Sequence, residues 1–155
     1  MTSIRERLEA KRRRTAVVPV LVSDPSEDQQ AAVTLQQAHA LRLREEGYDS
    51  AVGAAAVEAA AARVREHWAD VHLQSLPPAE WEMIVSTHTG ETGIDWDAVL
   101  ALLLAHSCID PDLRDEEWWA ARLADDAWSA GDTAALKRAL LLLNVDAFDP
   151  YVPKG

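Results

Sequence analysis

The feature that most constrains the fold is the stretch of residues 76–144, where apolar residues at helical spacing occur together with five of the chain's six tryptophans. Four residues in it have the character of helix starts, as oxygen-bearing caps or as a proline suited to the first helical position. These residues are Pro78, Asp95, Asp115 and Ser129. We therefore expect a compact four-helix, tryptophan-marked module over residues 76–145. Three tryptophans are expected to lie mainly inside its core, namely Trp81, Trp96 and Trp128.

The adjacent pair Trp118 and Trp119 cannot share one environment easily. Neighbouring residues on a helix point about 100° apart, so both rings can hardly face the same core. One of the two is expected at the edge of the core or in an interface, where tryptophan is a common anchor. The last helix is rich in leucine on several sides and is the other candidate surface. The candidate partner-binding residues are Trp118, Trp119, Leu136, Leu140 and Leu143.

An alanine-rich helical hairpin is predicted for residues 24–75. Asp24 followed by Pro25 is a strong helix start, and Gly47 can end that helix in the left-handed conformation. A second helix is expected to begin near Asp49 or Ser50. It should carry one apolar stripe of residues spaced four, three, four and three apart. The stripe consists of Val57, Ala61, Val64, Trp68 and Val71. The two helices should fold back as an antiparallel pair.

Residues 1–23 are predicted to be a basic N-terminal arm with a short extended segment. Residues 15–22 form a β-branched run, in which Pro19 removes a backbone donor and restricts the run to an edge strand or an extended arm. No second strand is visible in the sequence. We expect the segment to pack over the helices, and the sharper alternative is that it adds a strand to a partner subunit. The tail, residues 146–155, contains two prolines and cannot be helical throughout.

The charge of the chain is divided unevenly. Residues 1–14 hold six basic and two acidic residues (net +4), so the remaining nine basic and 24 acidic residues give the rest of the chain a charge of −15 and the whole a charge of −11. Such an acidic body should repel phosphates, so no nucleic acid partner is expected. The longest apolar run is about half the roughly 20 residues of a spanning helix, so no membrane partner is expected either. The basic head could contact the acidic body of another copy, so self-association is possible.

No catalytic motif stands out. His67 and His72 are five residues apart, which on a helix separates them by about 140° and disfavours a shared metal. The lone Cys108 lacks a nucleophile signature, and no Gly-rich phosphate loop occurs. Acid pairs such as Glu116 and Glu117 are explained by the preference for acids at helix starts. The chain is therefore predicted not to be an enzyme and to need no metal or cofactor.

Several motifs in this order resemble the small tail assembly chaperones of long-tailed (siphovirus-like) bacteriophages and prophages of actinobacteria. They are the Arg-rich opening at 5–14 with the β-branched run 15–22, Leu-Pro-Pro-Ala-Glu-Trp at 76–81, Asp-Pro-Asp-Leu at 110–113, Glu-Glu-Trp at 116–118, and Ser-Ala-Gly-Asp at 129–132 before a leucine-rich helix ending at Asn144. The chain departs from the family pattern where residues 97–99 replace a proline-containing segment and where Trp119 and Trp128 replace less bulky residues.

The resemblance implies a non-enzymatic, mostly helical factor that coats the tape measure protein and hands it to the tail-tube protein. It also implies a location in the cytoplasm of the bacterial host. Two alternatives stay open. The first is a structural tail or head–tail connector subunit, in which residues 15–22 would add a strand to a neighbour. The second is an acidic helical inhibitor of a regulatory protein.

Overall fold

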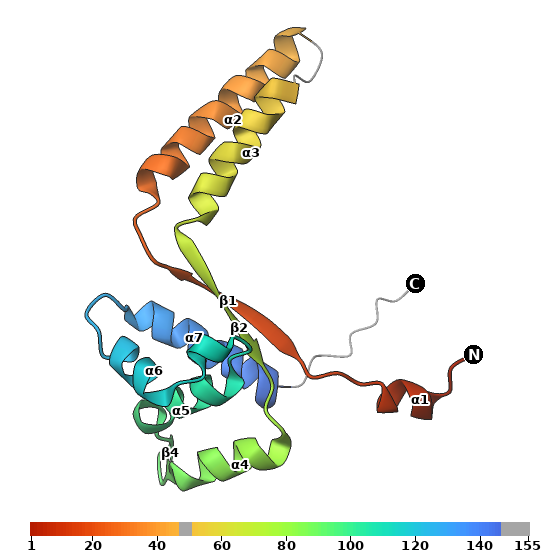
Figure 1. The fold of residues 1–155 in the computed structure, drawn as a ribbon, viewed down its shortest axis with the longest axis vertical. Helices are drawn as coiled ribbons and strands as arrows, with labels where there is room; N and C mark the ends of the chain where they lie inside the picture. Colours follow the sequence, from red (N-terminus) through yellow and green to blue (C-terminus); the bar gives the residue numbers. More distant parts are fainter. Residues whose placement is uncertain (47–50, 147–155) are drawn as a thin grey trace. The chain divides into compact units, whose positions relative to one another are not determined.

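The computed structural model describes residues 1–46 and 51–146, of which 63% are helical (Figure 1). The mainly helical prediction is confirmed. The elements in chain order are α1 (Ile4–Glu9), β1 (Thr15–Leu21), α2 (Ser26–Glu46), α3 (Ala51–Arg65), β2 (Trp68–Gln74), α4 (Pro78–Thr87), β3 (Thr89–Gly90), β4 (Gly93–Ile94), α5 (Trp96–Ser107), the 3-10 turn Pro111–Leu113, α6 (Glu116–Leu123) and α7 (Ala130–Asn144). The chain divides into two compact units, one formed by Met1–Val18 with Val71–Gly155 and the other by Pro19–Asp70.

The unit Pro19–Asp70 contains the predicted helical hairpin. Helices α2 and α3 lie side by side and run in opposite directions (Figure 1). The start of α2 is as expected, because the Asp24 carboxylate accepts hydrogen bonds from the backbone N–H and the hydroxyl of Ser26. The interface is thin, since Ala60 is the fully buried residue of α3 and no larger side chain there is equally covered among the described residues. The expected helix end at Gly47 and the expected start at Asp49 or Ser50 lie outside the described residues.

The prediction that the second helix of the hairpin continues to Val71 is wrong. Helix α3 ends at Arg65, and Trp68–Gln74 is strand β2. Burial alternates along this strand, with Val71 and Leu73 buried and His72 exposed between them. That period of two is the signature of a strand with one covered face. The expected stripe therefore breaks after Val64, because the last two of its members belong to a strand.

The prediction of an extended N-terminal arm is also wrong. Residues 1–23 are all described, and they form no such arm. Residues Thr15–Leu21 form β1, which pairs antiparallel with β2 of the same chain. Backbone hydrogen bonds extend the pairing at both ends, from Ser75 N–H to the Arg14 carbonyl and from Val22 N–H to the His67 carbonyl. The sequence does not reveal this partner strand, because Trp68 and Val71 also fit the helical spacing of the residues before them. The basic stretch before β1, residues 1–14, contains the short helix α1.

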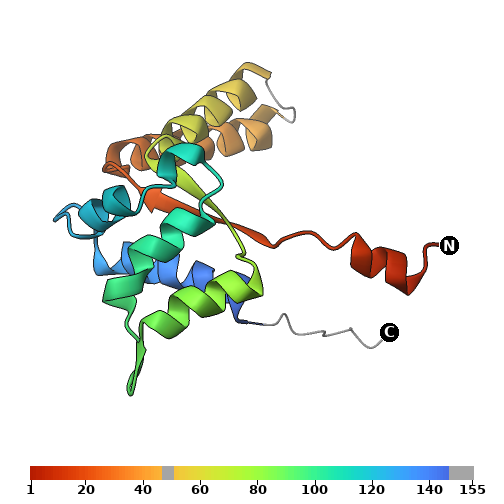
Figure 2. The same ribbon diagram turned by 60° about the horizontal axis from the view of Figure 1, so that its bottom comes forward.

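Helices α4 to α7 form the core of the other unit, and all four predicted start signals are confirmed. Pro78 occupies the first turn of α4, and the side chains of Asp95 and Asp115 accept hydrogen bonds from the first-turn amides of α5 and α6. Ser129 and Asp132 form a reciprocal capping box at α7. The segment between α4 and α5 forms the small antiparallel β3–β4 hairpin (Figure 2). Gly93 there has φ +109°, which suits glycine alone.

The core of this unit is built from one face of α5 and one face of α7, closed by β2 and α6. Among its described residues, nine side chains are fully buried, and the largest is that of Trp119. Its neighbour Trp118 is 38% exposed, so the expectation that the pair is divided between core and surface is confirmed. The three tryptophans expected mainly inside are half-buried at the margin of the core, namely Trp81, Trp96 and Trp128. Among the described residues, no helix is both long and apolar enough to cross a membrane.

Replacement of each member of the tryptophan pair should separate their roles. Trp119→Ala removes a fully buried ring and its 2.7 Å hydrogen bond from Nε1 to the Leu113 carbonyl, so we expect a loss of about 3–5 kcal/mol in the free energy of unfolding. Trp118→Ala is the matched control and should cost about 1 kcal/mol, since it loses an edge-to-face contact and little burial. Urea unfolding followed by circular dichroism measures both. Equal losses for the two variants would contradict this assignment of core and surface.

Candidate partner-binding groove

A groove of about 600 Å³ lies between α5, α6 and α7, all within one unit. Twelve residues line it, five from the first half of α5, four from α6 and its C-terminal end, and three from α7. They are Trp96, Asp97, Ala98, Leu100, Ala101, Glu116, Ala120, Leu123, Ala124, Ala130, Thr133 and Lys137. The volume falls in the range of ordinary ligand and peptide sites.

Helical spacing explains why these residues face the same space. On α6 the lining residues Glu116, Ala120 and Leu123 recur at intervals of four and three, and on α7 Ala130, Thr133 and Lys137 recur at intervals of three and four. Both sets form a single stripe along their helix. Half of the lining residues are alanine or threonine, and these small side chains leave the space between the three helices unfilled. The backbone of a partner segment with small or apolar side chains can therefore approach the groove closely.

The groove combines an apolar floor with charges at its rim. Trp96, Leu100 and Leu123 supply the large apolar surfaces. The ammonium of Lys137 lies 4.9 Å from the centroid of the Trp96 ring, a cation–π contact that holds both side chains in place. Asp97 and Glu116 add two acids beside that single base. The chemistry suits an amphipathic segment with an apolar face and basic flanks.

The five residues predicted to bind a partner do not line this groove. Trp119, Leu136, Leu140 and Leu143 are at most 5% exposed and belong to the core beneath it. Trp118 alone is on the surface, where the Arg122 guanidinium lies 5.9 Å from its ring centroid. The groove itself was not predicted, although a signal was present, since alanine and leucine recur at spacings of four and three on α6 beside the tryptophan pair.

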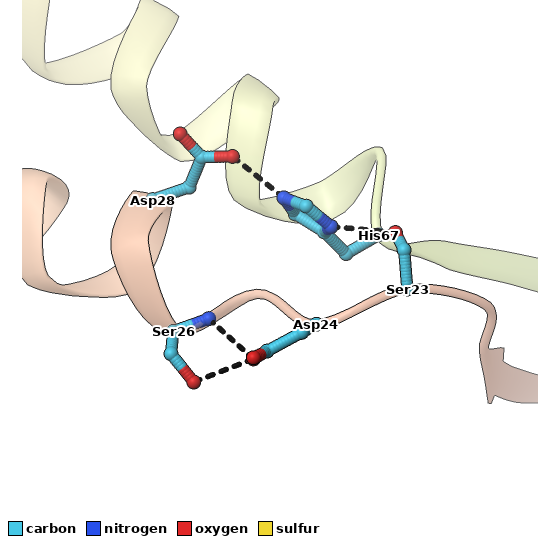
Figure 3. A network of polar contacts seen from close by, with 5 residues as sticks. All are labelled: Ser23, Asp24, Ser26, Asp28 and His67. Carbon is cyan, nitrogen blue, oxygen red and sulfur yellow. Dashed lines mark hydrogen bonds and ion pairs between the residues drawn. The ribbon is translucent and has the colours of Figure 1, made fainter.

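A hydrogen-bonded chain of serine, histidine and aspartate lies in the other unit (Figure 3). The Ser23 hydroxyl is 2.6 Å from His67 Nδ1, and His67 Nε2 is 2.6 Å from the Asp28 carboxylate. In serine hydrolases the nucleophile faces Nε2 and the acid faces Nδ1, which is the reverse. The three residues come from the segment between β1 and α2, the first turn of α2 and the turn between α3 and β2. This arrangement ties the open end of the helical hairpin together, and we call it the His67 clasp.

The remaining reactive groups are placed for structure. Burial raises the pKa of the Cys108 thiol to about 11, so the thiol is neutral and a poor nucleophile near neutral pH. The hydroxyl and backbone N–H of Ser26 lower the pKa of the Asp24 carboxyl, which fits its capping role. Within residues 1–46 and 51–146, no three side chains of His, Cys, Asp or Glu are grouped so as to hold a metal ion.

Comparison with known proteins adds no relative. No protein family matches the chain, and no match was found among curated proteins or solved structures.

Removal of the His67 clasp should loosen the helical hairpin. His67→Ala deletes two side-chain hydrogen bonds, each of which contributes about 0.5–1.5 kcal/mol. We expect amide hydrogen exchange in α2 and α3 to become about tenfold faster, measured by mass spectrometry on the intact chain. His72→Ala is the matched control, because the His72 side chain is exposed on β2. If both variants exchange alike in the hairpin, the clasp is not a stabilising element.

Proposed function

We propose that the chain is a non-enzymatic tail assembly chaperone whose groove between α5, α6 and α7 receives an amphipathic helix of a phage tape measure protein. The observation that carries the proposal is the groove itself, about 600 Å³ of space lined by small and apolar side chains on three helices. The identity of the partner rests on the resemblance of the sequence motifs to that family. On the same basis we propose that the chain acts in the cytoplasm of the bacterial host and delivers the tape measure to the tail-tube protein.

The geometry of the groove favours a helix as its occupant. Amphipathic helices bind in apolar grooves by inserting side chains spaced three and four residues apart, and the lining residues of α6 and α7 have the same spacing. Burial of apolar area contributes about 25 cal/mol per Å², so a few inserted side chains suffice for reversible binding. Reversibility matters, because a chaperone must release its client to the polymerising tube.

The net charge supports the same role. A charge of −11 on 155 residues keeps copies of the protein apart from one another except where basic groups are concentrated. A long tape measure covered by such chains would present an acidic surface to solvent and resist aggregation. Acids at the groove rim, Asp97 and Glu116, also favour a client helix with basic flanks.

The connector alternative is less favoured by the strand pairing. Donation of residues 15–22 to a neighbour's sheet in place of their own pairing would require β1 to leave β2 and to expose the buried Val18 and Val20. Rings held by such a strand would persist in high salt, since backbone hydrogen bonds are not screened as surface charges are. Salt-resistant rings on size-exclusion chromatography with light scattering would favour the connector. Tight 1:1 binding to a DNA-binding protein would favour the inhibitor.

A pair of neighbouring alanines on α6 gives a direct test of the groove. Ala120 lines the groove, whereas Ala121 is exposed on the same helix and points about 100° away from it. Ala120→Glu places a charge where the client's apolar face would lie, and an uncompensated charge there costs more than the 1.4 kcal/mol that corresponds to tenfold in affinity. We expect soluble recovery of a co-expressed tape measure fragment to fall about tenfold or more, and Ala121→Glu to leave it unchanged.

Circular dichroism of both variants checks that each is folded. The proposal fails if wild-type protein solubilises none of several fragments that together span a tape measure protein. It also fails if the two glutamate variants recover the same amount of client.

A further inference from the structure

A second groove, of about 470 Å³, lies at the other end of the same unit and has the opposite chemistry to the first. One wall is the basic run of residues 11–14. Its large apolar lining residues are Leu76, Trp81 and Leu143, which we call the floor. The remaining lining residues are Ser75, Pro77, Pro78 and residues 144–146 at the end of α7. We call it the basic groove. It concentrates four positive charges in a chain whose remaining residues, 15–155, carry a charge of −15.

Hydrogen bonds fix the shape of the basic groove. Arg14 Nη1 donates to the carbonyls of Leu142, at 3.3 Å, and Asp146, at 2.6 Å, where a cation also complements the C-terminal end of α7. The Asn144 side chain accepts from the Leu76 N–H at 2.7 Å and donates to the Leu140 carbonyl at 2.8 Å. The side chains of residues 11–13 are exposed at the rim of this anchored floor. An occupant would thus need acidic groups beside a large apolar side chain.

This chain carries such a segment at the start of α6. Asp115, Glu116 and Glu117 are exposed and are followed directly by Trp118, which is the exposed member of the tryptophan pair. The Trp118 ring is held by an edge-to-face contact to Trp119, with centroids 5.0 Å apart, and by the neighbouring Arg122. An anchor that is already ordered loses little entropy when it binds. We call residues 115–118 the acidic anchor.

We propose that the basic groove of one copy binds the acidic anchor of a second copy, with Trp118 against the apolar floor and Glu117 beside residues 11–13. Every copy carries both surfaces, so copies can join head-to-tail, which leaves one unused groove and one unused anchor at the ends of each assembly. Repetition of this contact would line up copies along an extended client. The inference does not depend on the proposed tape measure partner, because it concerns the free protein.

A charge swap tests the contact in purified protein without any tail component. The groove variant is Arg12→Glu with Arg13→Glu, and the anchor variant is Glu116→Arg with Glu117→Arg. In sedimentation equilibrium at low salt, the average mass of wild-type protein should rise with concentration, while each variant alone should associate about tenfold or more weakly. A mixture of the two variants should associate again, because the unchanged basic groove of the anchor variant meets the unchanged acidic anchor of the groove variant, and the two altered surfaces also carry opposite charges.

Two further samples make the test specific. Arg44→Glu with Arg63→Glu changes the net charge of the chain as the groove variant does, but on exposed positions of the helical hairpin, and should associate like wild type. Trp118→Ala should weaken association with the charges intact. Salt near 1 M, where the Debye length is about 3 Å, should weaken the wild-type contact as well.

Several results would overturn the proposal. One is that wild-type protein keeps the mass of a single chain at every concentration. This result would overturn the proposal even if the basic groove bound a foreign acidic peptide that contains tryptophan. Another is association that neither swap weakens, which would place the contact on a different surface. The third is a mixture of the two swaps, both folded by circular dichroism, that stays monomeric.

Discussion

The antiparallel pairing of β1 with β2 is the interaction on which the other features depend. It joins Thr15–Leu21, which precedes the helical hairpin in the sequence, to Trp68–Gln74, which follows it. Strand β2 in turn contacts the end of α5 through the bridge between Leu73 and Cys108. Since Leu73 and Cys108 are both fully buried, this end of β2 belongs to the helical core of its unit. The same pairing places the basic run just before β1 against the start of α4 and the end of α7.

Two surfaces with different chemistry result from this architecture. The groove between α5, α6 and α7 is formed by small and apolar side chains and suits an apolar helix face. The basic groove is formed by charge around a small apolar floor and suits an acidic anchor. A factor that binds a long client and also aligns with its own copies needs both kinds of contact. The proposed chaperone role and the proposed self-association are thus compatible, and each can fail without the other.

Local signals predicted much of the helical structure, while the nonlocal pairing escaped. Asp95, Asp115 and Ser129 cap helices because capping depends on a few adjacent residues. The division of Trp118 from Trp119 followed from helix geometry alone. Strand β2 was missed because Val64, Trp68 and Val71 also fit a helical period, and only the distant β1 decides between the two. The full lining of both grooves and the His67 clasp depend on tertiary neighbours, so the spacing of alanine and leucine on α6 could indicate only one wall of the first groove.

Amide hydrogen exchange of the isolated full-length chain, followed by NMR, tests the strand pairing most directly. The N–H groups of Val22, Ser75 and Ile109 donate to the carbonyls of His67, Arg14 and His72, which belong to β2 or flank the strand pair. We predict that all three amides are protected in the free protein. Exchange of the Val22 and Ser75 amides at the rate of an unstructured peptide would contradict the account. It would restore residues 15–22 as an arm available to another subunit.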